Sequence, residues 1–227
     1  MTNQTTELTN LNPQITAFQN QLRHKYDQEN QTAQKGQIVF VGSSLMEIFP
    51  IGKLQQQQDW GLNYHIYNRG VRATTTADLL AHMETLIFDL QPSKLFINIG
   101  SNDIGFNVPE TEFKANYDQI LTQIQTRLPQ TKIYVMAYYP VNTTADFGEA
   151  HEEHAALYEH RSNTRLQQAN RLVAKLAAKH QVPFINVNAG LTDQNGELKP
   201  VLTFDGAHML PQGYEIVFQN LLPYLGV

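Results

Sequence analysis

Short runs of β-branched and aromatic residues alternate with longer stretches of helical periodicity along most of the chain. The runs predict five strands, over residues 38–41, 64–68, 94–99, 132–138 and 183–187. Apolar positions at helical spacing predict helices over 75–90, 111–128, 163–180 and 212–225. Such alternation is typical of parallel β-α-β units, whose strands are nearly continuously apolar because helices cover both faces of the sheet. The pattern therefore predicts an α/β fold, a three-layer α/β/α sandwich around a five-stranded parallel sheet.

The first 36 residues differ from the rest, because they are polar and rich in Gln, Asn and Thr. Apolar residues within them still recur at helical spacing and predict one amphipathic helix: Ile15, Phe18, Leu22 and Tyr26. The remaining residues show no repeat, low-complexity linker or change of composition that would mark a domain boundary. We therefore interpret 1–36 as an N-terminal helical extension and 37–227 as one domain.

Charge and composition exclude several classes of protein. Lys and Arg number 16 against 21 Asp and Glu, a formal charge of −5, whereas a nucleic-acid binder needs clustered positive charge. No apolar run approaches the ~18 residues that span a bilayer, and the N-terminus resembles no signal peptide. We therefore expect a cytoplasmic protein with no nucleic-acid partner and no stable membrane insertion. The chain contains no cysteine, so a covalent catalyst would be Ser, Thr, Lys or a carboxylate.

Polar segments follow the predicted strands, where ligands bind in open parallel sheets. These segments are 42–45, 69–71 and 100–103 after the first three strands, and 204–208 before the last helix. Serine occurs five times in the chain, and three of these serines lie in the segments: Ser43, Ser44 and Ser101. A serine at this place is most often a helix cap. Ser43 and Ser44 cannot both cap one helix, so one hydroxyl is left for another role.

The segments resemble, in the same order along the chain, the four sequence blocks of the SGNH or GDSL family of serine ester hydrolases. The motifs that carry the resemblance are Gly-Ser-Ser-Leu at 42–45, Asn-Arg-Gly at 68–70, Gly-Ser-Asn-Asp at 100–103 and Asp-Gly-Ala-His at 205–208. Ser43 departs from the family pattern, because the first block usually carries Asp there; serine resembles the platelet-activating-factor acetylhydrolase-like branch. The resemblance implies the SGNH hydrolase fold, which is flavodoxin-like, and leaves Ser43 as a minor rival nucleophile.

Each block supplies one part of the catalytic set that the resemblance implies. Ser44 corresponds to the nucleophile, His208 to the base and Asp205 to the acid that orients it. The chemistry requires these residue types, because a serine hydroxyl attacks at neutral pH only when a base such as imidazole takes its proton. The oxyanion donors would be the Ser44 amide, the Gly70 amide and the Asn102 side chain.

The resemblance thus implies a carboxylic ester hydrolase that works through an acyl-enzyme and uses neither cofactor nor metal. Its expected partner is a small ester substrate with a short acyl chain, such as an acetyl ester of a lipid or sugar. A non-catalytic protein that binds carbohydrate or lipid in the same cleft is the alternative. A flavodoxin-like nucleotide or flavin binder also fits the alternation of elements, but the first loop lacks a phosphate-binding motif. A homo-oligomer is compatible with the sequence.

A long excursion follows the fourth predicted strand, over residues 140–163. Long loops in compact domains are often functional. We put forward the hypothesis that this segment forms a lid or pocket wall over Ser44 and helps to select the acyl or alcohol group. Its histidines, His151 and His154, are three residues apart instead of the four of a zinc H-E-x-x-H motif. An exposed, charged helix turn is therefore the better interpretation of that stretch.

Overall fold

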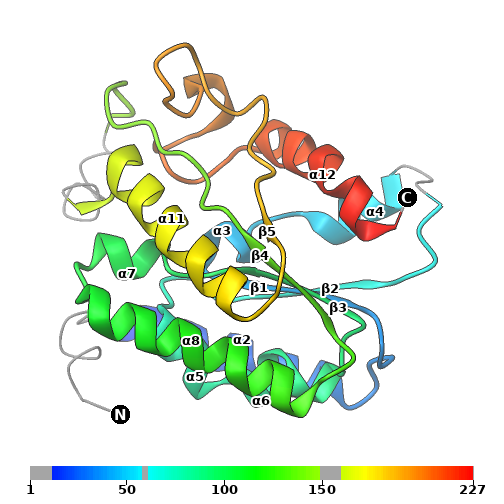
Figure 1. Cartoon of the computed structure of the whole chain (residues 1–227). Coiled ribbons are helices and arrows are strands. Elements are labelled where there is room, and N and C mark those ends of the chain that lie inside the picture. The colour runs from blue at the N-terminus through cyan, green and yellow to red at the C-terminus, as the bar shows by residue number, and fades with distance from the viewer. Residues whose placement is uncertain (1–11, 58–60, 149–159, 227) are drawn as a thin grey trace.

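The computed structural model describes residues 12–57, 61–148 and 160–226, and within them a central sheet of five parallel strands (Figure 1). The strands are β1 (Ile38–Gly42), β2 (Ile66–Gly70), β3 (Lys94–Asn98), β4 (Lys132–Met136) and β5 (Phe184–Ile185). Their order in the sheet is β2-β1-β3-β4-β5, and every neighbouring pair is parallel. β5 is shorter than predicted, because it pairs with β4 over two residues. The sheet otherwise confirms the predicted α/β fold.

Helices cover both faces of the sheet (Figure 1). One face is packed against α2 (Pro13–Asn30), α5 (Thr76–Ala81), α6 (Met83–Leu86), α8 (Glu110–Arg127) and α11 (Asn163–Lys179). The other is packed against α3 (Ser44–Glu47), α4 (Ile51–Gln57) and α12 (Pro211–Leu225). Alternate strand residues point to opposite faces, so Val39 and Val41 join the first core and Ile38 and Phe40 the second. This arrangement is the predicted three-layer sandwich.

The helix predicted over 75–90 is divided into α5, α6 and a 3₁₀ turn, η1 (Phe88–Leu90). α5 begins in a capping box formed by Thr75 and Asp78. It ends at His82, whose ring Nδ1 donates a hydrogen bond to the Asp78 carbonyl at 2.8 Å. In a continuous helix that carbonyl would accept the His82 amide. The His82 side chain therefore takes the place of its own amide and ends the helix.

The N-terminal helix forms as α2, and its buried face coincides only partly with the predicted one, because Tyr26 is buried and Leu22 packs against the core. Its buried residues are Gln19, Arg23, Tyr26 and Asn30, at helical spacing. Phe18, which the apolar pattern placed on the inner face, is 36% exposed. α2 packs against other described parts of this chain, chiefly α6. The division into an extension and a domain at residue 36 stays a prediction.

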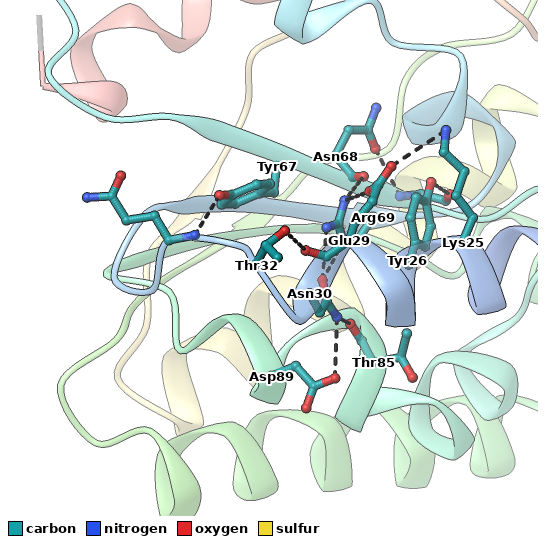
Figure 2. A network of polar contacts seen from close by, with 12 residues as sticks. Lys25, Tyr26, Glu29, Asn30, Thr32, Tyr67, Asn68, Arg69, Thr85 and Asp89 are labelled. Carbon is teal, nitrogen blue, oxygen red and sulfur yellow. Dashed lines mark hydrogen bonds and ion pairs between the residues drawn. The ribbon is translucent and has the colours of Figure 1, made fainter.

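Figure 2 shows how the polar face of α2 is fastened to β2. The side-chain oxygen of Asn30 accepts hydrogen bonds from Nη2 of Arg69 at 2.9 Å and from Nε at 3.3 Å. The Asn30 side chain also donates to the Thr85 carbonyl at 2.7 Å, and Tyr26 donates to the Gly70 carbonyl at 2.9 Å. Because these polar groups have hydrogen-bond partners, their burial between α2 and the sheet costs little. The helix thereby holds the carboxyl end of β2.

Candidate active site

The nucleophile segment begins directly where β1 ends. Gly42, the last residue of β1, lies opposite Gly70 of β2 and Asn98 of β3. A Cβ atom at Gly42 would lie 2.4 Å from the Asn98 carbonyl oxygen, so a larger residue would push β3 away. After Gly42 the chain is extended at Ser43, the N-cap, and Ser44 is the first residue of α3. The tight turn places Ser44 at the carboxyl edge of the sheet.

Ser44, His208 and Asp205 form one chain of hydrogen bonds. The Ser44 Oγ lies 2.8 Å from Nε2 of His208, and Nδ1 of His208 lies 2.6 Å from Oδ2 of Asp205. An ionised carboxylate can only accept, so Nδ1 of His208 carries the proton that it donates to Asp205. In the neutral imidazole this leaves Nε2 as an acceptor for the Ser44 hydroxyl. The geometry is that of a nucleophile, a base and an orienting acid.

The Asp205 carboxylate is held from both sides within its own loop. Its side chain is fully buried, and Oδ1 accepts the amides of Ala207 at 2.9 Å and His208 at 2.7 Å. Burial by itself would raise the pKa of this carboxyl. The hydrogen bond and charge of His208, together with the two amides, outweigh that effect and hold the pKa of Asp205 below its ordinary value. Asp205 is therefore an anion in a fixed orientation at neutral pH.

The loop that carries His208 is stabilised by hydrogen bonds between residues 203–208 and by contacts with the excursion over 140–163. Thr203 Oγ1 donates to the His208 carbonyl at 2.7 Å and accepts the Gly206 amide at 2.9 Å. Gly206 has φ +91°, and a Cβ there would lie 2.3 Å from the carbonyl oxygen of Asn142. The Asn142 amide in turn donates to the Gly206 carbonyl at 2.7 Å. Glycine is thus required at this position for both backbone conformation and space.

Asn102 lies in the first turn of α7 (Ser101–Gly105), which follows the carboxyl end of β3. Its side chain is buried, and Nδ2 donates to the carbonyl of Thr74 at 2.8 Å. Its Oδ1 accepts a hydrogen bond from Nη2 of Arg161. A carboxamide nitrogen carries two hydrogens, so Asn102 retains one beyond that given to Thr74.

Gly70 has a different environment from the one that the family resemblance implies. Its amide hydrogen donates to Oδ1 of Asn68 at 2.9 Å. A Cβ at Gly70 would lie 2.2 Å from the Glu47 amide nitrogen and 2.6 Å from the Met46 carbonyl carbon. The missing side chain therefore lets α3 pack directly on β2. The hydrogen bond to Asn68 argues against the predicted use of the Gly70 amide as an oxyanion donor.

The neighbours of Ser44 and Asn102, which are Ser43 and Asp103, are both buried. Ser43 is buried, and among the described residues its side chain does not cap α3. Asp103, next to Asn102, is also buried and accepts hydrogen bonds from the amide and hydroxyl of Thr76. Burial raises the pKa of Asp103 to about 7, although the hydrogen bonds from Thr76 act in the opposite direction. Asp103 thus ties α7 to the start of α5.

Part of the excursion over 140–163 contacts the catalytic loop. Asn142 bonds Gly206, as described above, and Phe147 lies 3.1 Å from the position of a Cβ at Gly206. His151 and His154, and the middle of the postulated lid over 149–159, lie outside the described residues. Within the part of the chain that is described, no group of three His, Asp or Glu residues is placed to hold a metal ion.

Three residues at the site were missed by sequence reasoning: Thr74, Gly206 and Arg161. Thr74 and Arg161 contact Asn102 from distant parts of the chain, and nothing in their local sequence indicates that contact. Gly206 carried a signal, because a glycine inside a short catalytic motif indicates a positive φ or a close approach. Ala73, with φ 57°, adds an unusual backbone conformation just before Thr74.

A hydrogen-bonded Ser-His-Asp set at the carboxyl edge of a parallel α/β/α sheet is the arrangement of an SGNH-type serine hydrolase. The model of the GDSL-like Lipase/Acylhydrolase family matches residues 40–216. The chain therefore belongs to this family of carboxylic ester hydrolases. The comparison with curated proteins gives no match. Among the described residues, no helix combines the length and apolar character needed to cross a membrane.

Solved structures share the fold over most of the chain. A protein from Streptococcus pneumoniae, proposed to be a platelet activating factor, is 33% identical with a TM-score of 0.79, over 91% of this chain and 92% of its own. A proposed acylhydrolase from Bacteroides fragilis is 20% identical with a TM-score of 0.72, over 89% and 94%. A catalytic mutant of the acetylxylan esterase Axe2 from Geobacillus stearothermophilus is 17% identical with a TM-score of 0.61, over 86% and 96%. At 20% and 17% identity, the last two structures show that the fold is shared and nothing more.

Proposed function

We propose that this protein hydrolyses short-chain carboxylic esters through an acyl-enzyme formed on Ser44. The observation that carries the proposal is the continuous hydrogen-bond chain from Ser44 through His208 to the buried Asp205. A serine in such a chain loses its proton to the imidazole as it attacks, and is a far better nucleophile than a free hydroxyl. Family membership independently supports an ester as the substrate.

In the acylation step, the Ser44 Oγ attacks the ester carbonyl carbon while its proton passes to Nε2 of His208. The tetrahedral intermediate collapses with cleavage of the bond to the alkoxy oxygen, which takes the proton from His208 and leaves as the alcohol. A water molecule then attacks the acyl-enzyme, His208 takes its proton, and the acid leaves as Ser44 is reprotonated. Asp205 stabilises the imidazolium in both steps and fixes its tautomer.

The negative charge on the carbonyl oxygen requires donors that are already in place. Two groups of this chain suit the role: the Ser44 amide, which has no intrahelical acceptor at the first position of α3, and the second hydrogen on Nδ2 of Asn102. The Gly70 amide, predicted as a third donor, would first have to leave Asn68. We therefore propose that Ser44 and Asn102 carry most of the stabilisation.

Acetyl esters of lipids or sugars are the substrates that we favour. The resemblance of the first block to the platelet-activating-factor acetylhydrolase-like branch supports a small acyl group, and so does the fold shared with an acetylxylan esterase. On this chain, Phe204 is 51% exposed and its ring is nearly parallel to that of His208, with centroids 5.8 Å apart. An exposed aromatic ring beside the base offers an apolar contact to the substrate at that end of the site.

The test is hydrolysis of p-nitrophenyl esters from acetyl to octanoyl, combined with fluorophosphonate labelling located by peptide mass. We expect highest activity on acetyl, label on Ser44, and a fall in kcat of at least about 10³-fold in Ser44→Ala. Ser43→Ala is the matched control, because it removes the adjacent hydroxyl; it should keep both the label and most of the activity. Folded wild-type protein with neither turnover nor label would contradict the proposal and favour a binding protein with the same cleft.

A further inference from the structure

Arg161 is a buried charge with no role in the reaction as described so far. It is 1% exposed and lies where the excursion over 140–163 leads into α11, next to Ser162, the N-cap of that helix. Its Nε donates to the Ser101 carbonyl at 3.1 Å, and its Nη2 donates to Oδ1 of Asn102. Both acceptors belong to the first turn of α7. A buried guanidinium is costly unless such contacts compensate for its lost hydration.

The contact decides which way the Asn102 carboxamide points. A guanidinium has donors and no acceptor, so the Asn102 atom that faces Arg161 has to be the oxygen. The nitrogen, Nδ2, is then turned to the opposite side, where one hydrogen reaches the Thr74 carbonyl at 2.8 Å. If the carboxamide rotated by half a turn, the amide group would face the guanidinium and the oxygen would face a carbonyl. Both contacts would become repulsive.

The positive charge also acts on the donor itself. A cation at Oδ1 draws electron density from the carboxamide and makes the remaining N–H of Asn102 a stronger hydrogen-bond donor, as in other polarised hydrogen-bond chains. The effect is useful where a negative charge develops, and it is larger in a buried site than in water.

We propose that Arg161 is a positioning residue of the oxyanion hole, which orients and polarises the Asn102 side chain without touching the substrate. This inference rests on the proposed function, because it assigns Arg161 to the same reaction. The carboxyl end of the excursion would then contribute to catalysis through the hydrogen bond between Arg161 and Asn102, which are 59 residues apart in the sequence.

The experiment is a double-mutant cycle on Arg161 and Asn102 with p-nitrophenyl acetate. We expect Asn102→Ala to lower kcat by about 10²–10³-fold, the usual effect of removing one oxyanion donor. Arg161→Met should lower kcat by roughly 10–100-fold, as other residues that orient a functional side chain do. In the double variant the second substitution should add less than about twofold, because Arg161 acts through Asn102. The pH dependence of kcat/KM should stay that of the wild type, since His208 is untouched.

Arg165→Met is the matched control. Arg165 lies in the first turn of α11, four residues after Arg161. It also donates from Nη2 to an asparagine oxygen, that of Asn107 at 2.9 Å, in an exposed position outside the site. It should keep wild-type kcat. Arg161→Lys tests the same idea with less perturbation and serves if Arg161→Met does not fold. A single ammonium cannot hold both acceptors in one plane, so we expect an intermediate kcat and a wild-type KM.

Three results would overturn the assignment. The first is a double variant in which the losses of kcat from the two substitutions multiply. The second is an Arg161 variant that folds and keeps wild-type kcat. The third is an Arg161 variant in which KM rises and kcat is unchanged. In each case the wild type would still hydrolyse the ester and carry the fluorophosphonate on Ser44, so the proposed function would stand. Absence of turnover and label in the wild type would instead overturn the proposed function and this inference together.

Discussion

The loop that carries His208 is held mainly by hydrogen bonds between residues 203–208, with further contacts to Ser44, Asn142 and Phe147. The hydrogen bonds described for the Asn102 side chain instead come from residues 28 and 59 positions away. On the base side, Asp205 accepts two amides and an imidazole of its own loop. On the oxyanion side, Asn102 depends on Thr74 in one loop and on Arg161 at the end of another. One half of the site is therefore organised locally and the other by the tertiary fold.

This difference has a consequence for substitutions outside the catalytic set. A change far from His208 in the chain has few routes to the base, because its loop carries its own hydrogen bonds. A change in α5, or in the segment that leads into α11, reaches Asn102 through Asp103 or Arg161, each of which has a partner in a different element. We expect the two halves to respond differently to steric, conformational and pH perturbation.

The largest effect should come from breaking the base loop at its one glycine, with Gly206→Ala. The new Cβ would lie 2.3 Å from the Asn142 carbonyl oxygen, and alanine would have to adopt φ +91°. The loop has to move, and displacement of a catalytic group by ~1 Å can cost ~10²-fold in rate. We expect kcat to fall by at least about 10²-fold and the melting temperature to fall by several degrees.

Gly196→Ala separates the effect of the positive φ from the effect of the steric contact with Asn142. Gly196 also has a positive φ, +79°, but a Cβ there meets nothing within 4 Å. That variant should lose about 1 kcal/mol of stability from backbone strain and retain wild-type kcat. Equal kinetics for the two variants would show that the contact with Asn142 does not hold the base loop.

A smaller loss is expected from Gly70→Ala, which acts on Ser44 across the sheet. The added methyl group would lie 2.2 Å from the Glu47 amide nitrogen, so α3 has to shift and carry the nucleophile with it. We expect kcat to fall by about 10–100-fold with a modest rise in KM. Gly52→Ala in the adjacent α4 is the control, because a Cβ there meets nothing; it should be neutral or stabilise the protein by up to about 1 kcal/mol. Unchanged kcat in Gly70→Ala would mean that α3 tolerates the displacement.

The contrast between the two halves also explains what the sequence predicts well. The parallel sheet follows from five apolar runs and the helices between them, because strand and helix periodicity are local properties. The acid and base were predicted together because Asp205 and His208 lie three residues apart in one motif. The capping box at Thr75 and Asp78 is local too, and it fixes the start of α5.

What was missed depends on tertiary contacts. The apolar pattern of α2 included Tyr26, which is buried, but not Asn30, which is buried by hydrogen bonds to β2 and to α6. The same holds for Arg161, whose partner is 59 residues away. The predicted role of Gly70 stays a prediction, and the hydrogen bond of its amide to Asn68 is a contact that the family motif does not show. A hydrogen bond between distant segments leaves no periodic signal in either of them.

The smallest effect concerns Asp103, and it is a dependence of stability on pH. In the unfolded chain this carboxyl titrates near its ordinary value of 3.8, whereas in the folded protein burial raises its pKa to about 7. Between these values the folded state keeps a proton that the unfolded state has lost. Raising the pH through this window therefore favours unfolding, and above about pH 7 the dependence from this group ends.

Asp103→Asn removes this titration and isolates it from the rest of the protein. The variant should be less stable at every pH, because an amide group would replace Oδ2, which accepts the Thr76 amide at 3.0 Å. The difference in melting temperature between wild type and variant should narrow as the pH rises from 4.5 to 7.5, since the wild type loses the contribution of its protonated carboxyl. Asp205 acts in the opposite direction, because its pKa is lowered and its contribution is lost in acid, but it is present in both proteins and cancels. A difference in melting temperature that is constant with pH would show that Asp103 is ionised in the folded state. The three hydrogen bonds from Thr76 would then outweigh its burial.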